Sequence, residues 1–92
     1  MGTLFVVGRP LETETLLVTL EGLVAQGEEV HVIFVQGGVG NAADEKLVRR
    51  MSFASSISCL DADAEVVDGV KQVDFNGWVR LIEGCEKIVS WT

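Results

Sequence analysis

The amino-acid sequence predicts an α/β fold, in the form of a three-layer α/β/α sandwich around a mainly parallel sheet of about five strands. Short apolar runs rich in β-branched residues alternate along the chain with segments whose apolar residues recur at helical spacing. The chain has 92 residues, of which 48% are hydrophobic and 23% are charged, so it can build one core but not two. We therefore expect a single domain over residues 1–92.

The first part of the chain predicts a β-α-β unit. Residues 3–7 and residues 29–35 are apolar runs followed by glycines, which is typical of buried strands. The helix between them is expected to start near Glu12 and Glu14, whose charges favour the positive end of a helix, and to stop at Gly27. Its apolar side is formed by Leu16, Leu17, Leu20, Leu23 and Val24.

The rest of the chain predicts three more helices and three more strands. Asn41 is the expected N-cap of a helix over residues 42–54, and Asn76 is the expected N-cap of a helix that runs to Gly84. Asp61 is expected to cap a short helix through residue 67. The remaining strands are expected at residues 57–60, 70–73 and 87–91.

The charge balance limits the partners of the protein. Fourteen acidic residues against seven basic ones give a net charge of −7, which repels nucleic-acid backbones and anionic membranes. We therefore expect no direct binding of nucleic acid and no membrane association. No apolar run approaches the length of about 18 residues that spans a bilayer, and the first residues lack the basic start of a signal peptide. The expected location is the cytoplasm.

A glycine-rich turn is the candidate nucleotide-binding motif. Residues 38–43 read Gly-Val-Gly-Asn-Ala-Ala, a G-x-G-x-x-A pattern between a predicted strand and a predicted helix. In larger domains this pattern holds the pyrophosphate of a dinucleotide, and Gly38 and Gly40 would then be binding residues. Here the pattern does not follow the first strand, and the chain is short for two mononucleotide-binding halves. These two features favour the alternative interpretation, a tight turn that uses glycines for their small size.

Cys59 is the candidate catalytic residue. It lies near the end of the third predicted strand and just before a predicted helix, where the helix dipole can stabilise a thiolate. The nearby carboxylates Asp61, Asp63 and Glu65 have the opposite effect and raise the pKa of a thiol. A cysteine at a strand end is also commonly a small core residue. Both interpretations stay open, a nucleophile that carries sulfur and a residue of the core.

The other metal-binding or reactive side chains are few. Cys85 is expected in the turn into the last strand, at the opposite end of a parallel sheet from Cys59, so no disulfide is expected. The two cysteines and the single histidine, His31, lack the paired spacing of a zinc site, and we expect neither a metal nor a cofactor. No serine and acid accompany His31 at a recognisable spacing, so we expect a buried, hydrogen-bonded histidine instead of a catalytic triad.

Three segments carry a family resemblance that covers nearly the whole chain. They are the N-terminal strand, residues 29–39 (Glu-Val-His-Val-Ile-Phe-Val-Gln-Gly-Gly-Val), and residues 73–81 (Val-Asp-Phe-Asn-Gly-Trp-Val-Arg-Leu) followed by Ser90-Trp91. In this order and spacing they resemble the DsrE/DsrF/DsrH superfamily of sulfur-relay proteins, and within it the small DsrH/TusB branch. That branch ends its second strand with Gln-Asp-Gly-Val, whereas this chain has Gly37 in place of the aspartate.

The resemblance implies an α/β/α sandwich that works in an assembly passing persulfide sulfur, either towards 2-thiouridine in tRNA or in dissimilatory sulfur oxidation. DsrE/TusD-type subunits carry the transferring cysteine at the end of a strand, and Cys59 falls at a similar place. The DsrH/TusB branch commonly lacks that cysteine and is regarded as a non-catalytic subunit. The resemblance therefore implies an interaction subunit, with a sulfurtransferase using Cys59 as the alternative and a nucleotide-binding module as a third interpretation.

The protein is expected to form oligomers. The chain is more apolar than one small core requires, and the excess is most simply placed at a subunit contact. Trp78 and Trp91 fit either the core or such a contact, and the region around Met51 and Phe53 is the expected contact surface. The resemblance implies copies of this chain or DsrE/DsrF-like or TusC/TusD-like proteins as the partners.

Overall fold

Five parallel strands form the central sheet, in the order β4-β3-β2-β1-β5. The computed structural model describes residues 2–9, 15–61 and 63–91. In chain order the elements are β1 (Thr3–Val7), α1 (Thr15–Ala25), β2 (Val30–Phe34), the 3₁₀ helix η1 (Gln36–Ala43), α2 (Glu45–Arg50), β3 (Ser56–Cys59), β4 (Lys71–Gln72), α3 (Phe75–Gly84) and β5 (Lys87–Trp91). The predicted α/β class and parallel sheet are confirmed. Glu12 and Glu14 lie outside the described residues.

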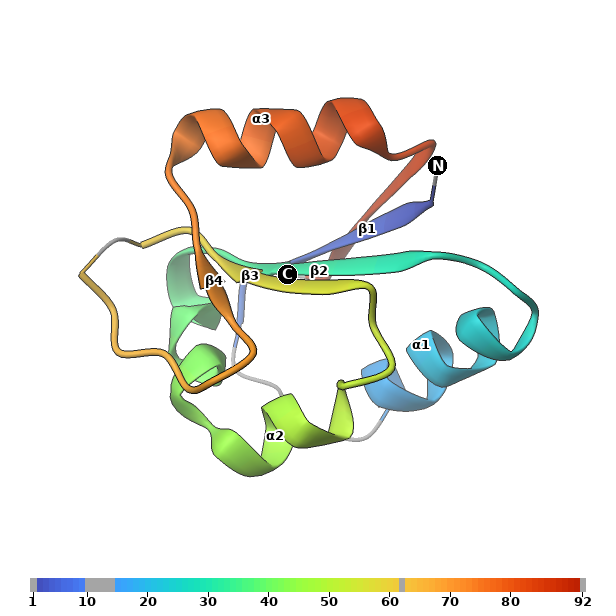
Figure 1. The fold of residues 1–92 in the computed structure, drawn as a ribbon, viewed down its shortest axis with the longest axis horizontal. Helices are drawn as coiled ribbons and strands as arrows, with labels where there is room; N and C mark the ends of the chain where they lie inside the picture. The colour runs from blue at the N-terminus through green and yellow to red at the C-terminus, as the bar shows by residue number, and fades with distance from the viewer. Residues whose placement is uncertain (1, 10–14, 62, 92) are drawn as a thin grey trace.

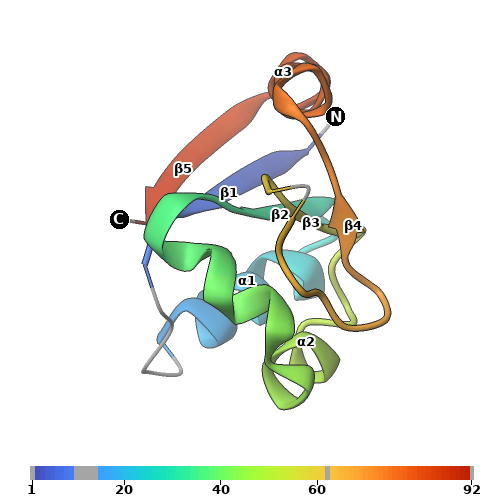
Figure 2. The ribbon, with the colours of Figure 1, turned by 90° about the vertical axis from the view of Figure 1, so that its left-hand side faces the viewer.

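The helices cover both faces of the sheet, which gives the three predicted layers. α1 and α2 lie below the sheet in Figure 1 and α3 lies above it, and Figure 2 shows the same separation from the side. Alternate residues of β1 point to opposite faces: Phe5 and Val7 pack with α1 and α2, whereas Leu4 and Val6 pack with α3. This burial on both faces explains why the central strands are apolar at nearly every position.

The second helix starts later than predicted. Asn41 is buried inside η1, where its side-chain amide donates a hydrogen bond to the Arg9 carbonyl over 2.9 Å, and it caps no helix. The cap of α2 is Asp44, whose carboxylate accepts a hydrogen bond from the Leu47 amide over 3.2 Å. The first and last parts of the predicted helix over residues 42–54 are therefore 3₁₀ and turn. The prediction was wrong because the amide of Asn41 bonds the distant turn after β1.

The predicted helix over residues 61–67 is absent from the described residues. Asp61 accepts a hydrogen bond from the Asp63 amide over 2.9 Å, which makes a local turn. The rest of the segment is held by tertiary contacts: the Val67 amide donates to the Ala42 carbonyl, and the Gln72 side chain donates to the Ala64 carbonyl. These bonds satisfy backbone groups that a helix would otherwise pair internally.

α3 begins at Phe75 because Asp74, and not the predicted Asn76, is its N-cap. The Asp74 carboxylate accepts a hydrogen bond from the Gly77 amide over 2.8 Å. No residue of α3 is fully buried, although Trp78, Leu81 and Ile82 pack against the sheet. α3 is thus the less enclosed of the two helical layers.

Large apolar side chains remain exposed at three places. They are Val18 on α1, Phe75 at the start of α3 and Ile88 on the edge strand β5, with exposed fractions of 64%, 66% and 48%. Met51, in contrast, is fully buried in the core and Phe53 is half-buried. The expected contact surface around Met51 is therefore wrong for that residue, since a fully enclosed side chain touches no second subunit.

Candidate functional site

The carboxyl ends of the strands meet along one edge of the sheet, the usual place for ligands in an open α/β fold. There the Val35 amide donates to the Val7 carbonyl over 2.9 Å, and the amide of Asn41 reaches the Arg9 carbonyl, so the turns after β1 and β2 are tied together. The Arg9 guanidinium lies 5.9 Å from the centre of the Trp91 ring, within the range of a cation–π contact. Arg9 is an exposed basic side chain at this edge.

The glycine turn at this edge is shaped by close packing. Gln36 has a left-handed backbone with φ of 48°, and the chain then passes directly over the end of β1. A Cβ atom at Gly38 would lie 2.2 Å from the Val7 carbonyl oxygen, and one at Gly37 would lie 3.0 Å from the Gly8 oxygen. Gly38 is therefore required by contact with the protein's own backbone. Gly37, where the DsrH/TusB branch has aspartate, also lies against backbone.

Cys59 ends β3 and is fully buried in the core between the sheet, α1 and α2. Burial raises the pKa of its thiol, and the nearby Asp61 carboxylate raises it further. The described residues that directly follow Cys59, 60–61 and 63–70, form no helix, so the helix start expected to stabilise a thiolate is missing there. The thiol is thus protonated and enclosed in this conformation. A role as persulfide carrier requires this part of the protein to open.

Cys85 lies at the other end of the sheet, between α3 and β5, and is half-buried. Burial raises the pKa of its thiol too, with a further rise from the Glu29 carboxylate. Both cysteines are free. The expectation that they form no disulfide is confirmed.

The structure joins three residues that sequence reasoning left apart. The His31 ring lies with Nδ1 2.7 Å from the Ser56 hydroxyl oxygen and Nε2 3.5 Å from a Glu29 carboxylate oxygen. The predicted hydrogen-bonded histidine is therefore correct, although it is half-buried. The signal for this contact was the parallel register of β2 and β3, which pairs His31 with Ser56.

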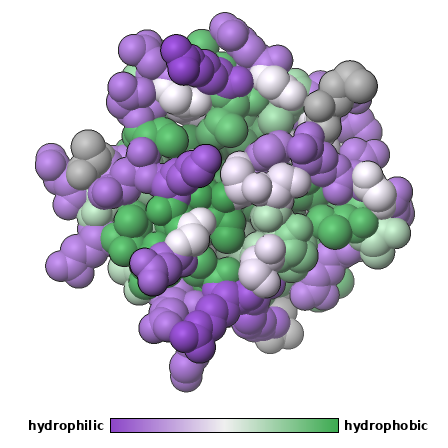
Figure 3. All heavy atoms as spheres, in the orientation of Figure 1, coloured by the Kyte–Doolittle hydropathy of each residue, from purple (hydrophilic) through white to green (hydrophobic). Residues whose placement is uncertain are grey.

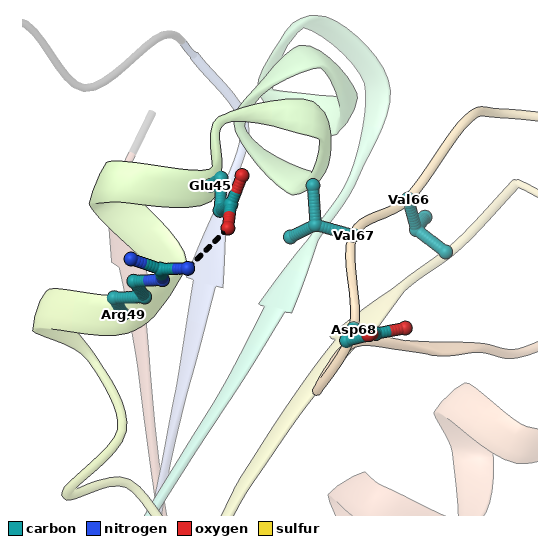
Figure 4. A pocket seen from close by; sticks show the side chains of 5 residues that line it. All are labelled: Glu45, Arg49, Val66, Val67 and Asp68. Carbon is teal, nitrogen blue, oxygen red and sulfur yellow. Dashed lines mark hydrogen bonds and ion pairs between the residues drawn. The ribbon is translucent and has the colours of Figure 1, made fainter.

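Two pockets lie next to one another beside α2. The first, of about 380 Å³, is lined by Glu45, Arg49, Val66, Val67 and Asp68. Figure 4 shows Arg49 bonded to Glu45 along α2, while Val67 points towards them from the facing segment and the Asp68 carboxylate turns away. The second, of about 290 Å³, shares Arg49 and Asp68 with the first and extends to Ser56.

These two pockets lie away from the glycine turn. Neither is lined by Gly38 or Gly40, and the cation that they share, Arg49, is paired with a carboxylate and accompanied by another.

The face that carries β4 shows apolar atoms across its middle, surrounded by polar side chains (Figure 3). The half-buried Val66, Val67 and Val70 belong to this side of the core.

The described part of the chain holds neither a metal-binding cluster nor a membrane-spanning helix. Among the described residues, no three His, Cys, Asp or Glu side chains are placed to hold a metal ion. Over the same residues, no helix has the length and apolarity needed to cross a membrane.

The fold and its strand ends define a class, namely small three-layer α/β proteins with a parallel sheet. The fold of the ychN protein from E. coli, known from a crystal structure, is similar to that of this chain. The match has a TM-score of 0.71 at 11% sequence identity and covers 98% of this chain and 99% of that chain. No family model matches the chain, and no curated protein matches its sequence. The similarity shows that the two chains share a fold.

Proposed function

We propose that the protein is a small interaction subunit of a sulfur-relay assembly of the DsrH/TusB type, which handles persulfide sulfur for tRNA 2-thiouridine synthesis or dissimilatory sulfur oxidation. The observation that carries the proposal is the fold match, which extends over 98% of this chain. The resemblance of residues 29–39 and 73–81 to that branch adds to it.

The state of Cys59 favours an interaction subunit over a sulfurtransferase. A transferring cysteine needs an accessible thiolate, because the thiolate is the nucleophile in sulfur exchange. The Cys59 side chain has no exposed surface, and burial and Asp61 both raise its pKa. The transfer step is accordingly assigned to a partner chain.

The α3 layer offers the surface for such a partner. Phe75, at the start of α3, is 66% exposed and contacts Trp78 edge-on, with ring centres 5.6 Å apart. Both rings belong to residues 73–81, the most specific segment of the resemblance. A paralogous subunit of the same fold that covers this apolar surface would bury it on association.

Co-expression with DsrE/DsrF-like and TusC/TusD-like proteins tests this proposal. Native mass spectrometry should detect a complex that contains this chain, and Phe75→Asp should weaken it by about tenfold or more, as loss of an aromatic anchor does. Val18→Asp is the matched control, because Val18 is similarly exposed but lies on α1, across the sheet from α3. A wild-type chain that binds none of these proteins would contradict the proposal.

The alternative, a persulfide on Cys59, rests on the position of this residue at the carboxyl end of β3. Incubation with a cysteine desulfurase and cysteine, followed by intact mass measurement, tests it. One added sulfur atom that is lost in Cys59→Ser and kept in Cys85→Ser would establish Cys59 as a carrier. Absence of the adduct on Cys59 would contradict the sulfurtransferase alternative.

A further inference from the structure

Two adjoining cavities lie beside α2, on the face of the sheet opposite α3, and together they form what we call the α2 trough. Their volumes are about 380 and 290 Å³, and Arg49 and Asp68 line both of them. Figure 4 shows α2 on one side of the larger cavity and the segment that carries Val67 on the other. These volumes fall at the low end of the range for small-molecule sites, so the trough has the size for a small ligand.

The smaller cavity of the trough has an apolar floor. Val48 and Ile57 are only 5% and 6% exposed, and Ala54, which lines the same cavity, is half-buried. Gly69 contributes another wall: its φ of 97° turns the chain there, and a Cβ atom on it would lie 3.9 Å from a methyl carbon of Val48. This floor suits an apolar group of a few carbons.

The place where the two cavities meet is charged. Glu45 and Arg49 lie one turn apart on α2, and their ion pair joins Glu45 Oε1 to Arg49 Nη2. The two side chains are 62% and 77% exposed, and an exposed pair of this spacing is weak enough to rearrange around a ligand. A guanidinium has five N–H donors and a carboxylate accepts through two oxygens, so both groups have further bonding capacity.

The balance of charge favours a ligand that carries both signs. The trough is lined by two carboxylates, Glu45 and Asp68, against the one guanidinium of Arg49, in a protein of net charge −7. A simple anion is repelled by this excess of acid, and a simple cation is repelled by Arg49. A neutral ligand with neighbouring carboxylate and ammonium groups can pair with Arg49 and Glu45 together. The Asp68 carboxylate turns away from that pair in Figure 4 and leaves the position open.

We propose that the α2 trough binds a free α-amino acid with a short apolar side chain. The ligand carboxylate pairs with Arg49 and its ammonium group pairs with the Glu45 carboxylate. The side chain enters the smaller cavity, over Val48, Ala54 and Ile57. Because Arg49 lines both cavities, a ligand held by it can reach Glu45 in one and the apolar floor in the other. This site goes beyond the proposed interaction function, since it lies across the sheet from α3.

Titration of the ¹⁵N-labelled protein with L-valine, followed by NMR, tests the proposal. The amide signals of Val48, Arg49 and Gly69 should shift, with a Kd on the order of 1 mM, as is usual for so small a ligand. Glycine should bind about tenfold or more weakly, because it lacks the apolar group. N-acetyl-L-valine and L-valinamide each lack one of the two charges, and each should also bind about tenfold or more weakly.

Variants of α2 and of the floor separate the parts of the site. Arg49→Gln and Glu45→Gln should each weaken L-valine binding by about tenfold or more. Arg50→Gln is the matched control, because Arg50 is the next residue of α2, is exposed and lines neither cavity, and it should leave the affinity unchanged. Ala54→Leu fills the floor and should remove the preference for L-valine over glycine.

Two outcomes in the wild-type protein depend on no variant's folding. The proposal is overturned if the amides of Val48, Arg49 and Gly69 do not shift with L-valine up to about 20 mM, well above the expected Kd. Equal affinity for L-valine and N-acetyl-L-valine would overturn it as well, since the ammonium group would then have no role. An Arg49→Gln protein with native-like amide signals and unchanged affinity would have the same consequence.

Discussion

Replacement of Gly38 by alanine should destabilise the protein by about 3 kcal/mol. The added Cβ would lie 2.2 Å from the Val7 oxygen, 2.9 Å from the Val7 carbonyl carbon and 3.1 Å from the Arg9 nitrogen. These are backbone atoms, so no side-chain rotation relieves the overlap, and η1 must move away from β1. Overpacking costs about 1–3 kcal/mol. The movement also strains the bond from the Val35 amide to Val7, and losing a buried hydrogen bond costs about 1–3 kcal/mol more.

Gly40→Ala is the matched control in the same 3₁₀ helix. A Cβ at Gly40 meets no atom within 4 Å, and its backbone is not in the left-handed region. Alanine there should leave stability unchanged or raise it by about 0.4–1 kcal/mol, because it restricts the unfolded chain. The pair of variants thus separates a steric role of the first glycine from a general need for glycine in this turn.

Urea denaturation followed by tryptophan fluorescence measures both variants. Gly38→Ala should lower the midpoint without changing the slope, and its melting temperature should fall by about 12 °C or more, at about 4–8 °C per kcal/mol for a domain of this size. Equal stability of the two variants would refute the argument from backbone contact. A loss of nucleotide affinity in a stable Gly38→Ala protein would refute it as well, since the glycine would then serve a ligand.

Three further outcomes are expected. Asp74→Ala should cost about 1 kcal/mol by removing the cap of α3, and Asp74→Asn should recover most of it; an unchanged melting temperature in the alanine variant would contradict the assigned cap. Because the pKa of Glu29 is lowered in the folded protein, its carboxylate stabilises the fold fully above its ordinary pKa of 4.5, and this stabilisation is lost as the pH falls through the lower pKa of the folded state. Acidification below pH 4.5 should therefore reduce the melting temperature of the wild type more than that of Glu29→Gln. Iodoacetamide should modify Cys85 faster than Cys59 in the folded protein, and both equally in urea; a faster Cys59 would show that the core opens readily there.

The strands were predictable from the sequence because a buried parallel strand has a strong local signature. The bounds of β1 and β5 match the prediction, and β2 and β3 differ from it by one residue at each end. β1 and β2 are short runs of mainly apolar or β-branched residues, whereas β3 and β5 mix such residues with serine or lysine. The class of fold followed from the alternation of these runs with helical segments.

The helix starts were less predictable because several residues near each start can cap it. Asn41 and Asp44 are both good N-cap residues, as are Asp74 and Asn76, and the structure uses the aspartate in each case. The choice depends on contacts that are distant in sequence, such as the bond from Asn41 to the Arg9 carbonyl. Local propensity does not encode such contacts.

The candidate sites were also predictable only in part from the sequence. The position of Cys59 at a strand end followed from its neighbours, whereas its complete burial depends on packing by two helices from elsewhere in the chain. The contact between His31 and Ser56 was missed because it requires the register of two parallel strands. Spacing along one chain segment gives no hint of that register.

The pairing of β5 with β1 has a consequence for the folding pathway. Thr3 pairs with Lys87, so this contact closes a loop that spans nearly the whole chain and has a large entropic cost early in folding. β1 meets β2 through the crossover that carries α1, a much smaller loop than the one closed by β5, so the other edge of β1 stays unpaired until the last strand docks. During that interval the backbone of Thr3–Val7 presents an apolar, unpaired edge to other chains. Refolding yield should therefore fall with protein concentration, and a peptide with the sequence of β5 added during refolding should compete for that edge.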